Sequence, residues 1–135
     1  YWPGEKEFGW QDEKGITALF MHDVRDRGIR AVMDEAIAAV GDGPTFLSVD
    51  VDVLDPVFAP GTGTPEPGGM TSTDLLLACR EVGAGVDLVG ADVVEVIPTG
   101  VASADVTCLV ADRIVREIAT GIAKMNTRTA STRLR

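Results

Sequence analysis

Residues 48–56 read SVDVDVLDP, and the alternation that runs into them predicts the strand on which the fold of this chain depends. Phe46, Ser48, Asp50 and Asp52 recur at every second position, so a strand would carry all four side chains on one face. Two carboxylates at the end of an apolar strand cost free energy unless a positive group holds them. Carboxylate oxygens suit a hard divalent cation, so Asp50 and Asp52 are candidate metal ligands.

The loop that follows, residues 59–69, reads APGTGTPEPGG. A backbone rich in glycine, proline and threonine can approach a ligand closely. A phosphate-binding P-loop is excluded, because no lysine follows the glycines and no helix is expected to begin there. The aspartates could instead cap loop amides, or bind the magnesium ion of a transferase or phosphatase. The magnesium alternative also needs a basic phosphate-binding cluster, which the sequence does not show.

Together, the run Ser-x-Asp-x-Asp-x-x-Asp-Pro and the loop Pro-Gly-Thr-Gly-Thr-Pro resemble the late signature of the ureohydrolases, the family of arginases, agmatinases and other guanidino-acid hydrolases. The resemblance implies a dinuclear manganese centre that activates water to split a guanidino group into urea and an amine. It also implies that Asp50 bridges two Mn²⁺ ions, that Asp52 binds one of them, and that Thr64 lines the substrate pocket. Glu95 matches the family glutamate that receives the guanidinium, whose paired donors fit a carboxylate.

Two departures favour agmatinase-like guanidino-acid amidinohydrolases over arginases proper. Ile97 stands where the family usually has asparagine in Glu-Val-Asn-Pro, and the loop ends in EPGG at residues 66–69. Asp92 is expected to lie near the metals or the loop in a supporting role. Asp55, which precedes a proline, is expected to hold the loop by hydrogen bonds.

The composition limits the classes of partner. The chain has 135 residues, a formal net charge of −9 and a pI near 4.4, which argues against binding to nucleic acid or to an anionic membrane surface. Cys79 and Cys108 lie in apolar patterns and are expected to be buried free thiols, which fits a cytoplasmic protein. The resemblance implies a small guanidino substrate and a homo-oligomer, either a trimer or a hexamer.

Alternating strand and helix patterns predict an α/β fold, with a parallel sheet, helices on both faces and ligands at the carboxyl ends of the strands. The resemblance implies the same three-layer, arginase-like architecture. Residues 1–15 are expected to form a surface loop, and residues 124–135 a flexible tail or an arm on a neighbouring subunit. The expected strands are 16–21, 45–53 and 86–97, and the expected helices are 28–40, 71 to 83 or 85, and 103–121.

His22 is the only histidine, and with no second histidine at ligand spacing it is interpreted as structural or superficial. The family's histidine ligands, including an Asp-x-His-x-Asp run, would precede Tyr1. Residues 1–135 are therefore interpreted as the C-terminal part of a single ureohydrolase domain. We expect this chain alone to be inactive, because Asp50 and Asp52 supply only part of a two-metal ligand shell. The non-enzymatic alternative is that this chain is a fragment with a role only in structure or assembly.

Overall fold

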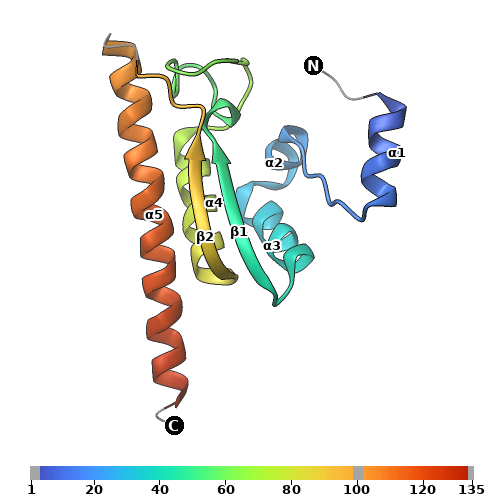
Figure 1. Ribbon diagram of the computed structural model, residues 1–135, viewed down its shortest axis with the longest axis vertical. Helices are drawn as coiled ribbons and strands as arrows, with labels where there is room; N and C mark the ends of the chain where they lie inside the picture. The colour runs from blue at the N-terminus through green and yellow to red at the C-terminus, as the bar shows by residue number, and fades with distance from the viewer. Residues whose placement is uncertain (1–3, 99–101, 134–135) are drawn as a thin grey trace.

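The computed structural model describes residues 4–98 and 102–133 as two strands and a set of helices (Figure 1). The elements are, in chain order, α1 (Glu5–Glu13), α2 (Met21–Arg27), α3 (Ile29–Val40), β1 (Pro44–Asp50), the 3₁₀ turn η1 (Val51–Val53), α4 (Ser72–Gly85), β2 (Asp87–Val94) and α5 (Ala102–Arg133). The predicted α/β class and parallel pairing are confirmed. No helix within the described ranges combines the length and apolar character needed to cross a membrane.

The two strands run parallel, so their carboxyl ends meet at one edge of the sheet. Thr45 pairs with Leu88 whereas Phe46 pairs with Gly90, so β2 carries one additional residue as a bulge. Beyond the bulge the register is regular up to the pair Asp50–Val94. The last residue of β1 therefore lies beside the last residue of β2.

Buried apolar side chains of β1, of the segment that follows it and of the helices α3, α4 and α5 form the core. Figure 1 shows α4 behind the two strands, with α5 alongside α4. Thr71 caps α4, accepting a hydrogen bond from the backbone N–H of Asp74. The buried cluster includes Ile29, Val49, Val51, Leu54, Leu75, Cys79, Ile114 and Ile118.

The last helix is longer than predicted. The prediction that it ends at Gly121 is wrong, because α5 continues to Arg133. A β-carbon on Gly121 would lie 2.3 Å from the carbonyl oxygen of Arg80, and one on Gly83 would lie 2.6 Å from that of Ile118. These glycines therefore allow α4 and α5 to pack closely, and Gly121 does not terminate its helix. The predicted flexible or assembly role of residues 124–135 stays a prediction.

The first part of the chain also differs from expectation. Residues 5–13 form α1, a surface helix where a loop is predicted, because glutamate, lysine and glutamine in this segment favour helix. Residues 16–20 form neither helix nor strand, and α2 begins at Met21, so the predicted strand over 16–21 is wrong. A short apolar run does not by periodicity alone distinguish a strand from other buried segments.

The strand before the aspartates ends earlier than predicted. β1 stops at Asp50, and Asp52 lies in the 3₁₀ turn η1, so the shared strand face extends only from Phe46 to Asp50. The strand predicted over residues 86–97 forms but is shorter, because β2 ends at Val94, and none of its residues is fully buried. Phe46 is 61% exposed and packs over Gly90, where a β-carbon would lie 2.9 Å from the ring.

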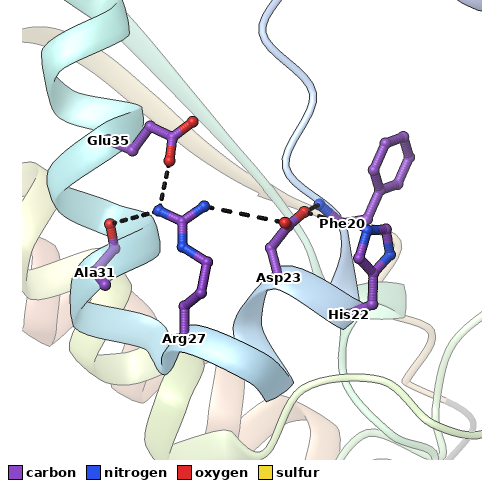
Figure 2. A network of polar contacts seen from close by, with 6 residues as sticks. All are labelled: Phe20, His22, Asp23, Arg27, Ala31 and Glu35. Carbon is purple, nitrogen blue, oxygen red and sulfur yellow. Dashed lines mark hydrogen bonds and ion pairs between the residues drawn. The ribbon is translucent and has the colours of Figure 1, made fainter.

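His22 occupies the first turn of α2, with its side chain at the surface (Figure 2). Its ring stacks on Phe20 at a centroid distance of 5.6 Å. Nearby, Asp23 accepts a hydrogen bond from the Phe20 N–H, and Arg27 reaches Glu35 of α3 at 2.5 Å. This network joins α2 to α3 and agrees with the structural interpretation of His22.

Both cysteines are free thiols. Cys79 is buried, and burial raises the pKa of its thiol to about 11. Cys108 is only half-buried, so the prediction of burial is correct for the first cysteine alone.

A buried carboxylate connects α4 to α5. Glu117 is 3% exposed and pairs with Arg80 of α4 and with Arg113 one turn earlier on α5, the latter at 2.9 Å. Burial alone would raise the pKa of Glu117, but the hydrogen bonds and charges of the two arginines outweigh it and lower that pKa. The ionised carboxylate of Glu117 therefore stabilises the packing of α4 against α5.

Replacing Glu117 by glutamine keeps the shape and removes the charge. In the natural protein that carries this chain, Glu117→Gln should lower the free energy of unfolding by about 2 kcal/mol, because both arginines lose a charge-assisted partner but still reach water. Denaturant unfolding measures this. The control is Asp112→Asn, which breaks an exposed pair with Arg116 and should cost about 0.3 kcal/mol.

The same variant has a pH signature. Because the pKa of Glu117 is lower in the folded than in the unfolded state, where it is about 4.3, its contribution is complete above the unfolded value. This contribution to stability is lost as the pH falls through the lower pKa that Glu117 has in the folded state. The stability difference between wild type and Glu117→Gln should be constant above about pH 5.5 and shrink below about pH 4. A difference that grows on acidification would contradict the assignment.

Candidate active site at the carboxyl ends of the strands

The loop over residues 55–70 is held by Asp55. Its carboxylate accepts hydrogen bonds from the backbone N–H groups of Gly68, at 2.9 Å, and Val57, at 3.1 Å. These two bonds, led by the one from Gly68, lower the pKa of Asp55. The prediction that Asp55 holds the loop by hydrogen bonds is confirmed.

The end of the loop returns to lie against its own beginning. Met70 donates its N–H to the carbonyl of Val53 at 2.8 Å and accepts from the N–H of Asp55 at 3.0 Å. A β-carbon on Gly69 would lie 2.6 Å from backbone atoms of Val53, Leu54 and Asp55. Only glycine fits this approach, which closes the loop into a compact structure.

Gly61 is held from two other elements. Its N–H donates to the hydroxyl of Thr107, a fully buried residue of α5, at 2.7 Å. Its carbonyl accepts from the N–H of Ile97 at 2.9 Å, in the segment that follows β2. The loop is therefore connected both to the segment after β2 and to α5.

The carboxylates of Asp50 and Asp52 lie at the carboxyl end of β1 and in the turn that follows it. Asp50 accepts a hydrogen bond from the N–H of Asp52 at 2.9 Å. The two carboxylate oxygens of Asp52 accept hydrogen bonds from the hydroxyls of Thr62 and Thr64 respectively. The structure thus brings together three of the four predicted site residues: Asp50, Asp52 and Thr64.

The fourth predicted residue, Glu95, reaches the same loop from β2. It directly follows the last residue of the strand and has a φ of 62°, the left-handed region that side chains other than glycine rarely adopt. A β-carbon on Gly63 would lie 3.3 Å from Oε2 of Glu95, so this carboxylate extends over the loop between Thr62 and Thr64. Strained backbone of this kind often marks a functional position.

Asp92 lies on β2 opposite Ser48, two residues before the strand ends, and its side chain is exposed. Its predicted supporting role near the metals or the loop stays a prediction.

The side chains described at this site offer oxygen atoms as possible metal ligands. The carboxylates of Asp50 and Asp52 and the threonine hydroxyls are of the chemistry that Mn²⁺ and Mg²⁺ accept. Within residues 4–98 and 102–133, no group of three or more histidine, cysteine, aspartate or glutamate side chains gathers at a distance suited to a metal. The described residues therefore fit part of a cation site.

A model of the arginase family matches residues 2–121. This chain belongs to the arginase family. The guanidinopropionase of Pseudomonas aeruginosa is 56% identical to this chain over 86 residues. The match covers 64% of this chain and 27% of that relative. The agmatinase of Chromobacterium violaceum is 40% identical over 107 residues, covering 73% of the chain and 33% of the relative. The chain thus spans about a third of the length of the curated relatives it matches.

Solved structures confirm the arginase-like fold. Proclavaminate amidinohydrolase from Streptomyces clavuligerus superposes with a TM-score of 0.79 at 34% identity, over 91% of this chain and 41% of that protein. A hypothetical agmatinase from Burkholderia thailandensis gives 0.78 at 35% identity, over 96% of this chain and 38% of the other. The predicted resemblance to ureohydrolases is therefore confirmed at the level of family and fold.

Sequence reasoning misses two threonines of this arginase-family site. Thr62 contacts Asp52, and its position beside Thr64, with one glycine between them, is a signal that the sequence does contain. Thr107 has no such signal, because it lies 46 residues from Gly61 on a helix whose apolar periodicity dominates the pattern.

Gly69→Ala tests the close approach of the loop to its own beginning. The added methyl group would meet backbone atoms that have no freedom to rotate away. The variant should therefore lower the free energy of unfolding by about 2 to 3 kcal/mol, as measured by denaturant unfolding. Gly43→Ala is the matched control, because a β-carbon there meets no atom within 4 Å. Equal stability of the two variants would show that the loop does not pack as described.

Proposed function

We propose that this chain carries part of the active site of an amidinohydrolase that uses Mn²⁺ to hydrolyse a guanidino group to urea and an amine. The observation that supports the proposal best is that two carboxylates, one after β1 and one after β2, reach the same loop. Asp52 contacts Thr62 and Thr64, and the Oε2 atom of Glu95 lies next to Gly63 between them. Membership of the arginase family and relatives named guanidinopropionase and agmatinase agree with this reaction class.

Asp50 and Asp52 would hold manganese. Their negative charges would offset the mutual repulsion of two divalent cations. When bound, such cations supply a water acidic enough to act as a nucleophile at neutral pH. The remaining ligands of a two-metal site would come from outside the described residues, in keeping with the fraction of its relatives that this chain spans.

Glu95 would bind the substrate. A guanidinium is planar and presents paired N–H donors, which match the two oxygens of one carboxylate. Glu95 is exposed at the carboxyl edge of the sheet, where a ligand can reach it. Thr64, also exposed beside Asp52, would line the same pocket. Ile97 in place of asparagine, and the EPGG end of the loop, favour agmatine or a guanidino acid over arginine.

A urea-release screen tests the proposed function. The natural protein that carries this chain is assayed with agmatine, guanidinopropionate, guanidinobutyrate and arginine, with added Mn²⁺ and after chelation, and separately with a phosphate ester and Mg²⁺. We expect urea from agmatine or a guanidino acid in preference to arginine, and loss of activity on chelation. Turnover of a phosphate ester with Mg²⁺, with no urea from any guanidino compound, would favour the transferase or phosphatase alternative. Absence of all these activities would favour a structural role.

Glu95→Gln tests the substrate-binding role on the best substrate of that screen. The change keeps the side-chain shape but removes the charge that pairs with the guanidinium. The variant should lose about 2 to 4 kcal/mol in kcat/KM, a factor of about 30 to 900, with bound manganese unchanged. Metal content is measured in parallel as the control. Near-normal turnover would show that the guanidinium binds elsewhere.

A further inference from the structure

We propose that Thr62 is a positioning residue, whose hydroxyl orients the carboxylate of Asp52 for cation binding and connects it to the backbone of Glu95. This inference rests on the proposed function, because it assumes that Asp52 binds a cation. It adds a residue and a role to that site: Thr62 acts through Asp52, without itself touching the substrate or the cation.

The hydroxyl of Thr62 lies between the two halves of the site. It donates to Oδ1 of Asp52, which follows β1, and lies 3.0 Å from the carbonyl oxygen of Glu95, which follows β2. A threonine hydroxyl has one proton, so it serves one of these acceptors at a time or is shared between them. The charged carboxylate is the stronger acceptor, which favours the bond to Asp52.

Thr62 is well placed for this role because its neighbour in the chain is fixed. Gly61 is buried, and both its N–H and its carbonyl are hydrogen-bonded, to Thr107 and Ile97 respectively. Thr62 is itself half-buried, whereas Thr64 is exposed two residues further along the loop. A hydrogen bond in a less hydrated place is electrostatically stronger. The contact from Thr62 should therefore constrain Asp52 more than the contact from Thr64.

A cation and both threonines can share the same carboxylate. An ionised carboxylate offers about four lone-pair positions, of which the two hydroxyls occupy two. The hydroxyls approach different oxygens of Asp52, so together they fix the plane of the carboxylate while leaving positions for a metal. Hydrogen bonds of this kind orient metal-binding carboxylates and tune their affinity.

The test measures Mn²⁺ binding directly, by electron paramagnetic resonance of free Mn²⁺ in equilibrium with the natural protein. Thr62→Val keeps the size of the side chain and removes the hydroxyl, and should weaken Mn²⁺ binding by roughly 10- to 100-fold. Thr62→Ser restores the hydroxyl and should bind within about 3-fold of wild type. Thr64→Val should weaken binding less than Thr62→Val. Thr120→Val, which loses a hydroxyl on the exposed surface of α5, should bind as wild type does.

The melting temperature of the metal-free protein separates positioning from a merely structural role. If Thr62 only stabilises the loop, Thr62→Val lowers this temperature but leaves Mn²⁺ affinity unchanged, and the proposal is wrong. Thr62→Ala, which adds no methyl group in the place of the hydroxyl, is measured alongside in case valine prevents folding. Weak Mn²⁺ binding by Thr62→Ala with an unchanged melting temperature would support the proposal as well.

Asp52→Ala distinguishes failure of this inference from failure of the proposed function. If Asp52→Ala loses manganese while Thr62→Val and Thr62→Ala do not, Asp52 is a ligand and Thr62 is not its positioning residue. If Asp52→Ala binds as much manganese as wild type, the assignment of the metal site itself is wrong. A larger effect of Thr64→Val than of Thr62→Val would also overturn the proposal.

Discussion

Both the N–H and the carbonyl of Gly61 are hydrogen-bonded, and the geometry of the candidate site depends on this constraint. Its N–H bonds to Thr107 of α5 and its carbonyl bonds to Ile97 after β2. A loop attached only at its own ends could move relative to the second strand. These two bonds instead fix the loop to α5 and to the segment after β2. Thr62 and Thr64 thereby meet Asp52 while Glu95 extends over the same loop.

Local hydrogen bonds shape the loop itself and keep one acidic residue out of the site. The carboxylate of Asp55 bonds to two backbone N–H groups, and the contact between Gly69 and residues 53–55 closes the chain. The carboxylate of Asp55 thereby binds backbone N–H groups of the loop, whereas Asp50 and Asp52 lie at the candidate site after β1. Proximity in the sequence thus does not give the three aspartates the same role.

The sequence predicts the parts of this structure that depend on local patterns. The helix over α3 and the hydrogen-bonding role of Asp55 follow from periodicity or spacing within a few residues. The parallel pairing follows from the alternation of strand and helix patterns. The errors arise where distant contacts decide. Gly121 reads as a helix stop until α4 is seen to pack against it, and Thr107 has no local signal for its bond to Gly61. The end of β1 at Asp50 likewise depends on the turn that carries Asp52 to the threonines.

The most direct test of this account is anomalous diffraction at the manganese edge, from crystals of the natural protein grown with Mn²⁺. The account predicts anomalous peaks at coordination distance, about 2.0 to 2.4 Å, from carboxylate oxygens of Asp50 and Asp52. Glu95 should lie outside that distance and face the substrate position, and the Thr62 hydroxyl should bond to Asp52. Manganese bound by Glu95, or peaks away from both aspartates, would contradict the account.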